Sequence, residues 1–163
     1  MKQTLTLITI YFCWLSWSYS QPLIYATQEV AQTNQIVSIP VRIEHFTDIL
    51  RFRYSVNWDP TVVEFVSLSE VGGIPFLGMD DFNFAGTADG NFVMDWSDAN
   101  PIGATVADHS LIYKINFLVL GGPGTSSPVA FTNTPSLIYV QRVSTGPAHI
   151  GLDREHGKIS VPQ

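Results

Sequence analysis

Residues 50–65 read LRFRYSVNWDPTVVEF, two strand patterns that meet at a Trp-Asp-Pro corner. In the first pattern, apolar residues alternate strictly with polar ones, a period of two that gives a strand one buried and one solvated face. The apolar set is Leu50, Phe52, Tyr54, Val56 and Trp58, and the polar set is Arg51, Arg53, Ser55 and Asn57. Pro fixes φ and Asp can accept hydrogen bonds from the following amides, so Asp59-Pro60 should end one strand and direct the next. This stretch predicts an all-β fold.

The rest of the chain extends the same pattern. Turn residues (Gly, Pro, Asn, Asp, Ser and Thr) recur about every eight to twelve residues, which is typical of a sandwich or barrel. No window of helical length shows a 3.6-residue apolar period. Strands are expected near residues 23–26, 36–44, 50–58, 62–68, 82–85, 92–97, 110–120, 128–133, 137–142 and 158–161.

The first twenty residues have the pattern of a secretory signal peptide. Lys2 gives a positive start, residues 5–17 form an apolar run, and Ser18-Tyr19-Ser20 fits a small-x-small cleavage site. The apolar run is shorter than the roughly 20 residues that span a bilayer, so no membrane span is predicted. We therefore expect a cleaved signal at residues 1–20, one domain at residues 21–163, and a secreted, extracellular or cell-surface protein.

Charge and cysteine content limit the classes of binding partner and the ways in which the domain can be stabilised. The chain has 14 acidic and 8 basic residues, a net charge of −6, and such a surface is poorly suited to nucleic acid or anionic lipid. Its one cysteine, Cys13, lies within the predicted signal. The exported domain is therefore expected to lack a disulfide and to depend on core packing.

Four segments, in this order and spacing, resemble the cohesin family. They are IVSIPVRIEHF at 36–46, RYSVNWDPTVVEFVSL at 53–68, FVMDWSDA at 92–99 and LIYKINFLVL at 111–120. Cohesins are bacterial extracellular nine-stranded jelly-roll β-sandwiches that hold dockerin modules in polysaccharide-degrading assemblies. The resemblance implies the same fold over nearly all of residues 21–163, and a dockerin-like protein partner.

The resemblance also implies where a partner would bind. In cohesins the strand equivalent to residues 50–58 helps to build the dockerin-binding surface, and the segment at 92–97 lies beside it. With Phe92, Met94 and Trp96 inside, a flat outer face would carry the candidate partner-binding residues Arg51, Arg53, Ser55, Asn57, Val93, Asp95 and Ser97.

The two arginines depart from the family pattern. Many dockerin-binding cohesins carry short polar or acidic side chains at the positions that align with Arg51 and Arg53. Arginine cannot accept the hydrogen bonds that such side chains accept, although it can bind a carboxylate or stack on an aromatic ring. The alternative is a structural role, in which Arg51 or Arg53 pairs with Asp95 on the neighbouring strand.

Two other kinds of non-catalytic function remain open. Direct carbohydrate binding would require exposed aromatic rings in a planar row, and the rings to inspect are Tyr25, Tyr54, Trp58, Tyr113 and Tyr139. A structural or adhesive subunit would self-associate through an edge strand. Trp58 and Trp96 continue the apolar alternation of their strands, so both are expected in the core. The apolar residues of 72–84 are expected to plug one end of the sandwich, and the alternative is an exposed apolar loop that contacts a partner.

No cofactor, metal or catalytic motif is predicted. Asp80, Asp81 and Asp89 match no calcium loop, and the four histidines (His45, His109, His149 and His156) lack metal-ligand spacing. Glycoside hydrolysis would need two carboxylates across a cleft, for which Glu64, Asp95 and Asp98 are candidates by residue type only. Serine hydrolase and phosphate-loop motifs are absent from the sequence. The sequence therefore predicts a binding module and no enzyme.

Overall fold

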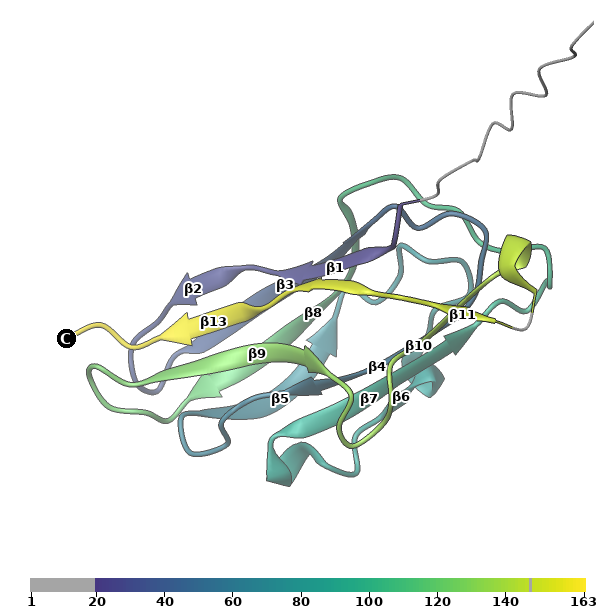
Figure 1. Ribbon diagram of the computed structural model, residues 1–163. Helices are drawn as coiled ribbons and strands as arrows, with labels where there is room; N and C mark the ends of the chain where they lie inside the picture. The colour runs from purple at the N-terminus through teal and green to yellow at the C-terminus, as the bar shows by residue number, and fades with distance from the viewer. Residues whose placement is uncertain (1–19, 147) are drawn as a thin grey trace, which may run out of the picture.

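The computed structural model describes residues 20–146 and 148–163 and shows an all-β sandwich of two sheets (Figure 1). The predicted all-β sandwich is confirmed, and nine of the thirteen strands in these residues have four or more residues. They are β1 (Leu23–Ala26), β3 (Ile36–Glu44), β4 (Ile49–Asn57), β5 (Val63–Ser69), β7 (Asn91–Ser97), β8 (Ser110–Val119), β9 (Ser126–Thr132), β10 (Tyr139–Arg142) and β13 (Gly157–Ser160). The predicted signal peptide, apart from Ser20, lies outside the described residues.

Four shorter strands and three single 3₁₀ turns complete the described chain. The strands are β2 (Gln28–Val30), β6 (Phe82–Asn83), β11 (His149–Ile150) and β12 (Asp153–Glu155), and the turns are η1 (Met79–Asp81), η2 (Thr87–Asp89) and η3 (Val143–Thr145). The strands β2, β11 and β12 were not predicted, because two or three residues are too few to show an alternation. None of the helical turns in the described residues is long and apolar enough to cross a bilayer.

The strand order places β4 at a junction of the larger sheet. The five-stranded sheet has the order β12-β1-β3-β8-β5. In the eight-stranded sheet, β7 pairs with one edge of β4 over residues 51–57, and β6 pairs with β7. The other edge of β4 is shared, since β10 pairs with residues 49–53 and β9 with residues 55–57 (Figure 1). The connection between β9 and β10 must therefore leave the sheet beside the middle of β4.

The predicted alternation along β4 is confirmed from Phe52 onward. Phe52, Tyr54 and Val56 are completely buried, and Trp58 is nearly so. Leu50 differs, because Ile49 is buried in its place. Opposite β10, Arg51 pairs with Gln141 and Ile49 with Arg142, so Leu50 is the extra residue of a β-bulge. The bulge moves the first residue of the predicted apolar set out of the core.

The Trp-Asp-Pro corner carries the chain from one sheet to the other. The Asp59 carboxylate accepts hydrogen bonds from the Thr61 hydroxyl at 2.6 Å and the Thr61 amide at 2.9 Å, and these lower the pKa of Asp59. The Asp59 carbonyl accepts a hydrogen bond from Val63, the first residue of β5. The prediction that this corner ends one strand and directs the next is confirmed.

Aromatic side chains fill the space between the sheets. Trp96 is completely buried and donates its ring N–H to the Pro75 carbonyl at 2.9 Å. Trp58 packs against Phe117 from the opposite sheet, and its buried ring N–H has no hydrogen-bond partner among the described residues. Both tryptophans belong to the core, as predicted. Segment 72–84 covers part of the core as expected, because Ile74, Leu77 and Phe82 are buried. Its other large apolar residues, Phe76 and Met79, remain exposed.

The first and last parts of the described chain follow the same path. β1 pairs with β12 and β2 pairs with β13, and both pairings are parallel. Each of the two segments crosses from the five-stranded to the eight-stranded sheet, between β1 and β2 and between β12 and β13. The strands β2 and β13 point toward the same end of the sandwich, where the C-terminus lies (Figure 1).

Candidate functional site

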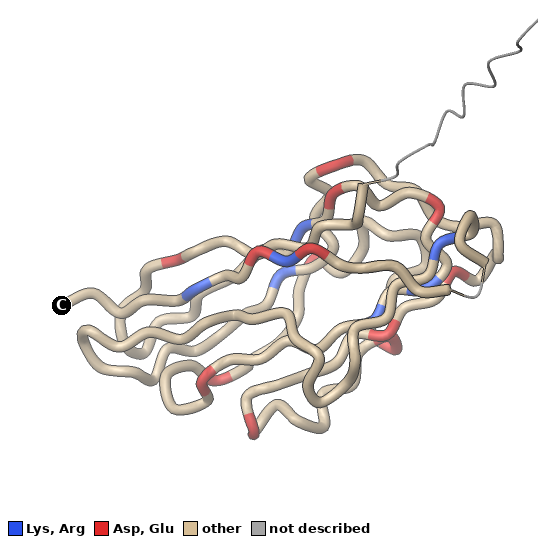
Figure 2. The backbone as a smooth tube through the Cα atoms, in the orientation of Figure 1, with Lys and Arg blue, Asp and Glu red and all other residues tan. Residues whose placement is uncertain are grey.

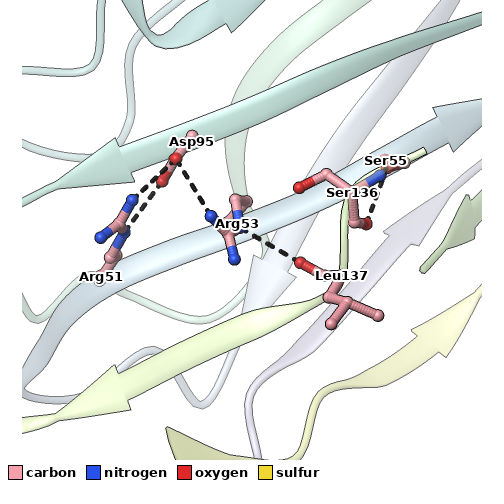
Figure 3. A network of polar contacts seen from close by, with 6 residues as sticks. All are labelled: Arg51, Arg53, Ser55, Asp95, Ser136 and Leu137. Atoms are coloured by element: carbon pink, nitrogen blue, oxygen red, sulfur yellow. Dashed lines mark hydrogen bonds and ion pairs between the residues drawn. The ribbon is translucent and has the colours of Figure 1, made fainter. Parts of the chain in front are cut away.

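An ion-pair cluster lies at the centre of the outer face of β4 and β7. Because β7 pairs with β4 in the predicted register, Arg53 lies opposite Asp95 and Arg51 opposite Ser97. Arg51 donates from Nε to Asp95 Oδ1 at 3.0 Å and from Nη2 to Asp95 Oδ2 at 2.8 Å, and this contact raises the pKa of Arg51. Arg53 Nη1 is 3.7 Å from Asp95 Oδ2. The predicted pairing of these residues is therefore present (Figure 3).

Tyr139 on β10 lies against both arginines from the other side. The guanidinium carbons of Arg51 and Arg53 are each 5.7 Å from the centroid of the Tyr139 ring. This distance falls within the about 6 Å over which a cation and an aromatic face attract each other. The arginines thus stack on an aromatic ring of the same chain, and β10, β4 and β7 together hold them in place.

Ser55 does not lie on an open surface, which corrects its predicted role as a contact residue. It is completely buried, because the connection between β9 and β10 covers it. Its hydroxyl donates to the Ser136 carbonyl at 2.9 Å and accepts from the Ser136 amide at 2.9 Å (Figure 3). Next to it, Arg53 Nε donates to the Leu137 carbonyl at 3.2 Å. Ser55 therefore anchors residues 133–138 across the face and cannot touch a partner directly.

The other three predicted residues lie toward the ends of the face. Ser97 is exposed beside Arg51, whereas Val93 and Asn57 are half-buried. The Asn57 side chain accepts a hydrogen bond from the Thr132 hydroxyl. The structure therefore groups Arg51, Arg53 and Asp95 at one place, with Ser97 next to them, and leaves Asn57 at the far side of the covering segment.

The outer face was predicted to be flat, but it is hollowed. A cavity of about 560 Å³ opens over β4 and β7, and a second one of about 350 Å³ adjoins it along β7. The covering segment forms one wall and η1 with β6 forms the other. The larger cavity is lined by Arg53, Asp80, Asp81, Phe82, Asn83, Val93, Asp95, Pro135 and Ser136. We call this hollow the β4–β7 groove.

The groove brings opposite charges close together. Basic and acidic positions lie side by side over β4 and β7 in Figure 2. Asp81 accepts a hydrogen bond from the Gly78 amide at 2.9 Å, and the exposed Asp80 makes no hydrogen bond or ion pair with a described residue. In residues 20–146 and 148–163, no group of three or more His, Cys, Asp or Glu is arranged to hold a metal ion.

The carboxylates considered for hydrolysis do not form a pair. Asp98 uses its two oxygens to accept the amides of Asn100 and Gly103 at 3.0 Å each, so it stabilises a turn. Glu64 lies on β5 in the five-stranded sheet, while Asp95 lies on β7 in the eight-stranded sheet and is held by Arg51. Asp95 and Asp98 are thus engaged by Arg51 and by backbone amides, and Glu64 lies on the other sheet.

The rings considered for carbohydrate binding do not form an exposed row. Tyr54 and Tyr113 are completely buried, and Trp58 is nearly so. Tyr25 and Tyr139 are half-buried and lie on different sheets, on β1 and β10. These five rings therefore provide no planar platform for a sugar chain.

Several residues of the groove were not recognised from the sequence. The sequence suggests Tyr139 only as a sugar platform, although the alternation of residues 137–142 places it on the same outer face as the arginines once β10 pairs with β4. For Asp80 and Asp81 the sequence suggests only calcium ligation or solvated turns. Pro135 and Ser136 carry no sequence signal for a groove wall, since their position depends on how β9 and β10 share the edge of β4.

The two sheets and their connections form the cohesin fold. Solved structures with this fold include the third cohesin of ScaC from Acetivibrio cellulolyticus, which has a TM-score of 0.70 and 16% identity and covers 88% of this chain and 100% of its own. A cohesin of OlpA from Clostridium thermocellum has a TM-score of 0.70 and 16% identity, with 87% and 99% coverage. A non-cellulosomal cohesin from the archaeon Archaeoglobus fulgidus has a TM-score of 0.66 and 14% identity, with 88% and 93% coverage.

The first two of these cohesins were solved in complex with dockerins. No family model matches this chain, and no curated protein matches it by sequence. At these identities the likeness establishes the fold.

Proposed function

We propose that this protein is a secreted, non-catalytic binding module that holds a protein partner on the outer face of β10, β4 and β7. The observation that carries the proposal is the preorganised cluster of Arg51, Arg53, Asp95 and Tyr139 beside an open groove. Four side chains on three paired strands hold one another in place, so little side-chain freedom is lost on binding. A rigid charged centre of this kind gives an interface its specificity and orientation.

Besides this charged cluster, a protein interface needs apolar contacts, and exposed apolar side chains lie in the loops and turns next to the β10, β4 and β7 face. Five of the nine large hydrophobic residues that are exposed in the described chain lie in these segments, namely Phe76, Met79, Ile102, Leu137 and Val143. Phe76 and Ile102 also line a cavity of about 240 Å³ that reaches Asp98, the residue that follows β7. Apolar anchors combined with a few fixed charges are typical of surfaces that bind proteins.

The outer face of the five-stranded sheet is less suited to a partner. Asn116 on β8 bonds there to Ser38 at 2.5 Å and to Ser67 and Ser69 at 3.1 Å each, and Lys114 pairs with Glu70 at 2.6 Å. These polar groups satisfy one another across β3, β8 and β5, so binding a partner would gain few new hydrogen bonds.

Self-association through an edge strand has no comparable support. β5 is an open edge of the five-stranded sheet, but its register with β8 shifts between Phe65 and Ser67. The extra residue of this bulge, Val66, interrupts regular pairing along the edge, and bulges of this kind protect edge strands against pairing with another chain.

A dockerin-like module on an extracellular polysaccharide-degrading enzyme or surface protein is the partner that we propose. The support is the cohesin fold, together with the dockerin complexes of similar folds. The two arginines require that this partner present hydrogen-bond acceptors, because a guanidinium only donates. Secretion rests on the signal pattern of residues 1–20.

A capture experiment on the source secretome tests the proposal. The wild type, an Arg51→Ala/Arg53→Ala variant and an Arg42→Ala/Lys114→Ala variant are immobilised, and captured proteins are quantified. Arg42 and Lys114 lie on the five-stranded sheet, so the last variant removes the same charge from the opposite face. We expect the Arg51/Arg53 variant alone to lose the captured proteins. Equal capture by all three proteins would remove the β4–β7 face from consideration.

A further inference from the structure

The two arginines of the cluster differ in their hydrogen-bond partners. Arg51 uses Nε and Nη2 to bind both oxygens of Asp95, so neither oxygen is left free of a guanidinium contact. Arg53 is 3.7 Å from the same carboxylate, which exceeds hydrogen-bonding distance. Its Nε donates to the Leu137 carbonyl, and its two terminal amino groups donate no hydrogen bond to a described residue. Arg51 therefore holds Asp95, and Arg53 keeps donors available.

These free donors belong to a residue that lines the larger cavity of the groove. Its volume of about 560 Å³ lies within the roughly 300–1,000 Å³ that is typical of ligand pockets. Arg53 is less than one-third exposed, so it is fixed against β4 and directed by its neighbours. A fixed guanidinium with open donors is a receptor for a carboxylate, which it binds by charge-assisted hydrogen bonds.

The opposite wall carries the opposite charge. Asp80 and Asp81 on η1 line the same cavity, and neither lies within ion-pair distance of a basic residue in the described chain. Both oxygens of Asp95 are bound by Arg51, so the cavity presents the terminal donors of Arg53 on one wall and two carboxylates without a basic partner on the other, of which Asp81 also accepts the Gly78 amide. A purely acidic partner segment would be repelled by Asp80 and Asp81, and a purely basic one by Arg53.

We infer that the groove selects a partner segment in which a carboxylate lies close to a basic side chain, with the carboxylate on Arg53 and the basic group on Asp80 and Asp81. This inference rests on the proposed binding function of the same face and adds the chemistry that the face recognises. The carboxylate of the occupant would accept from the terminal amino groups of Arg53, which donate no hydrogen bond within the described chain, and its basic group would pair with Asp80 and Asp81, which have no basic partner there.

A random twelve-residue peptide library displayed on phage is the probe. The library is panned against the immobilised wild-type protein, and the enriched peptides are synthesised for affinity measurements. We expect enriched peptides to contain Asp or Glu within a few positions of Lys or Arg. Binding should weaken about tenfold for Arg53→Gln and for Asp80→Asn/Asp81→Asn, and stay unchanged for Lys114→Gln on the opposite sheet.

A double-mutant cycle assigns each charge of the peptide to its partner. Changing the peptide carboxylate to an amide should cost little more once Arg53→Gln is present, but should retain its full effect in Asp80→Asn/Asp81→Asn. Neutralising the peptide's basic residue should show the reverse pattern. Thermal unfolding of each variant checks that the fold is intact, and peptides that bind Arg53→Gln as well as wild type would overturn the inference.

The same panning separates this inference from the proposed function. If the enriched peptides carry no paired charges but lose binding to Arg51→Ala/Arg53→Ala, the face binds partners and the inferred chemistry is wrong. If no peptide is enriched, or if binding responds to none of the face variants, both the inference and the proposed face fail.

Discussion

The hydroxyl groups of Tyr54 and Tyr113 lie 2.7 Å apart in the closed interior between the two sheets. Tyr54 belongs to β4 and Tyr113 to β8, so this hydrogen bond links the strand that carries the candidate site to the opposite layer. Each hydroxyl would be costly to bury alone, and together they satisfy each other. The pair fixes the inner side of the strand whose outer side presents Arg53.

This tyrosine pair should make stability fall at alkaline pH. Burial raises the pKa of both hydroxyls, and the interaction with Tyr113 raises that of Tyr54 further. Unfolded tyrosine ionises near about pH 10, so the pair's contribution is complete below that pH and is lost as the pH rises above it. Urea unfolding from pH 8 to 11 should show a steeper loss for wild type than for Tyr54→Phe/Tyr113→Phe. An unchanged slope in the double variant would contradict the prediction.

The two buried tryptophans should respond differently to the same substitution. Trp96→Phe removes a hydrogen bond and leaves the Pro75 carbonyl without its donor, whereas Trp58→Phe removes a donor that has no partner. Because the loss of volume is the same, Trp96→Phe should lower the free energy of unfolding by about 1 kcal/mol more than Trp58→Phe. Chemical denaturation of both variants measures the difference. Equal losses would mean that the Trp58 ring N–H is satisfied in solution.

Ser55→Ala should release the segment that covers the middle of the face. The variant loses both hydrogen bonds to Ser136, so the free energy of unfolding should fall by about 1–3 kcal/mol. Hydrogen exchange at the Ser136 amide should accelerate as well. Ser97→Ala, at an exposed position of the same face, should stay within about 0.5 kcal/mol of wild type. Unchanged exchange at Ser136 would show that other contacts hold the segment.

His156 should contribute to stability at neutral pH but not at acidic pH. Its Nδ1 accepts the Phe131 amide at 3.2 Å, so this ring must be unprotonated at Nδ1. Desolvation lowers the pKa of His156, and the nearby Arg154 lowers it further. The contribution is therefore complete above about pH 6.5 and is lost as the pH falls through the lowered pKa.

A comparison of His156→Asn with wild type between pH 7.5 and 5 measures this contribution. The stability difference between the two proteins should shrink as the pH falls. His149→Asn provides a control at an exposed histidine. A difference that stays constant over this range would contradict the role of the neutral ring.

The sequence predicts those parts of the fold that depend on local alternation. Phe52, Tyr54, Val56 and Trp58 are buried as their period of two requires, and β7 repeats this pattern with Phe92, Met94 and Trp96. The pairing of β7 with β4 followed from the family resemblance, because alternation alone says which face a residue shares but not which strand lies next to it. Arg51, Arg53 and Asp95 were found in this way.

Features that depend on strand ends and shared edges were not predictable. Leu50 leaves the core because β10 pairs around it in a bulge, and Ser55 is buried because β9 and β10 divide one edge of β4. The groove results from the same division, together with the path of η1 and β6 along β7. Each of these features depends on contacts between residues far apart in the sequence.

The parallel pairing of β1 with β12 and of β2 with β13 determines how the domain responds to mechanical tension. In Figure 1 the start of β1 and the C-terminus lie toward opposite ends of the sandwich. Pulling on these two points would slide the first segment past the last along their length. The backbone hydrogen bonds of both pairs would then be sheared together, since none could open before its neighbours, and the domain would resist extension in this direction more strongly than if its outermost strands could be unzipped one bond at a time.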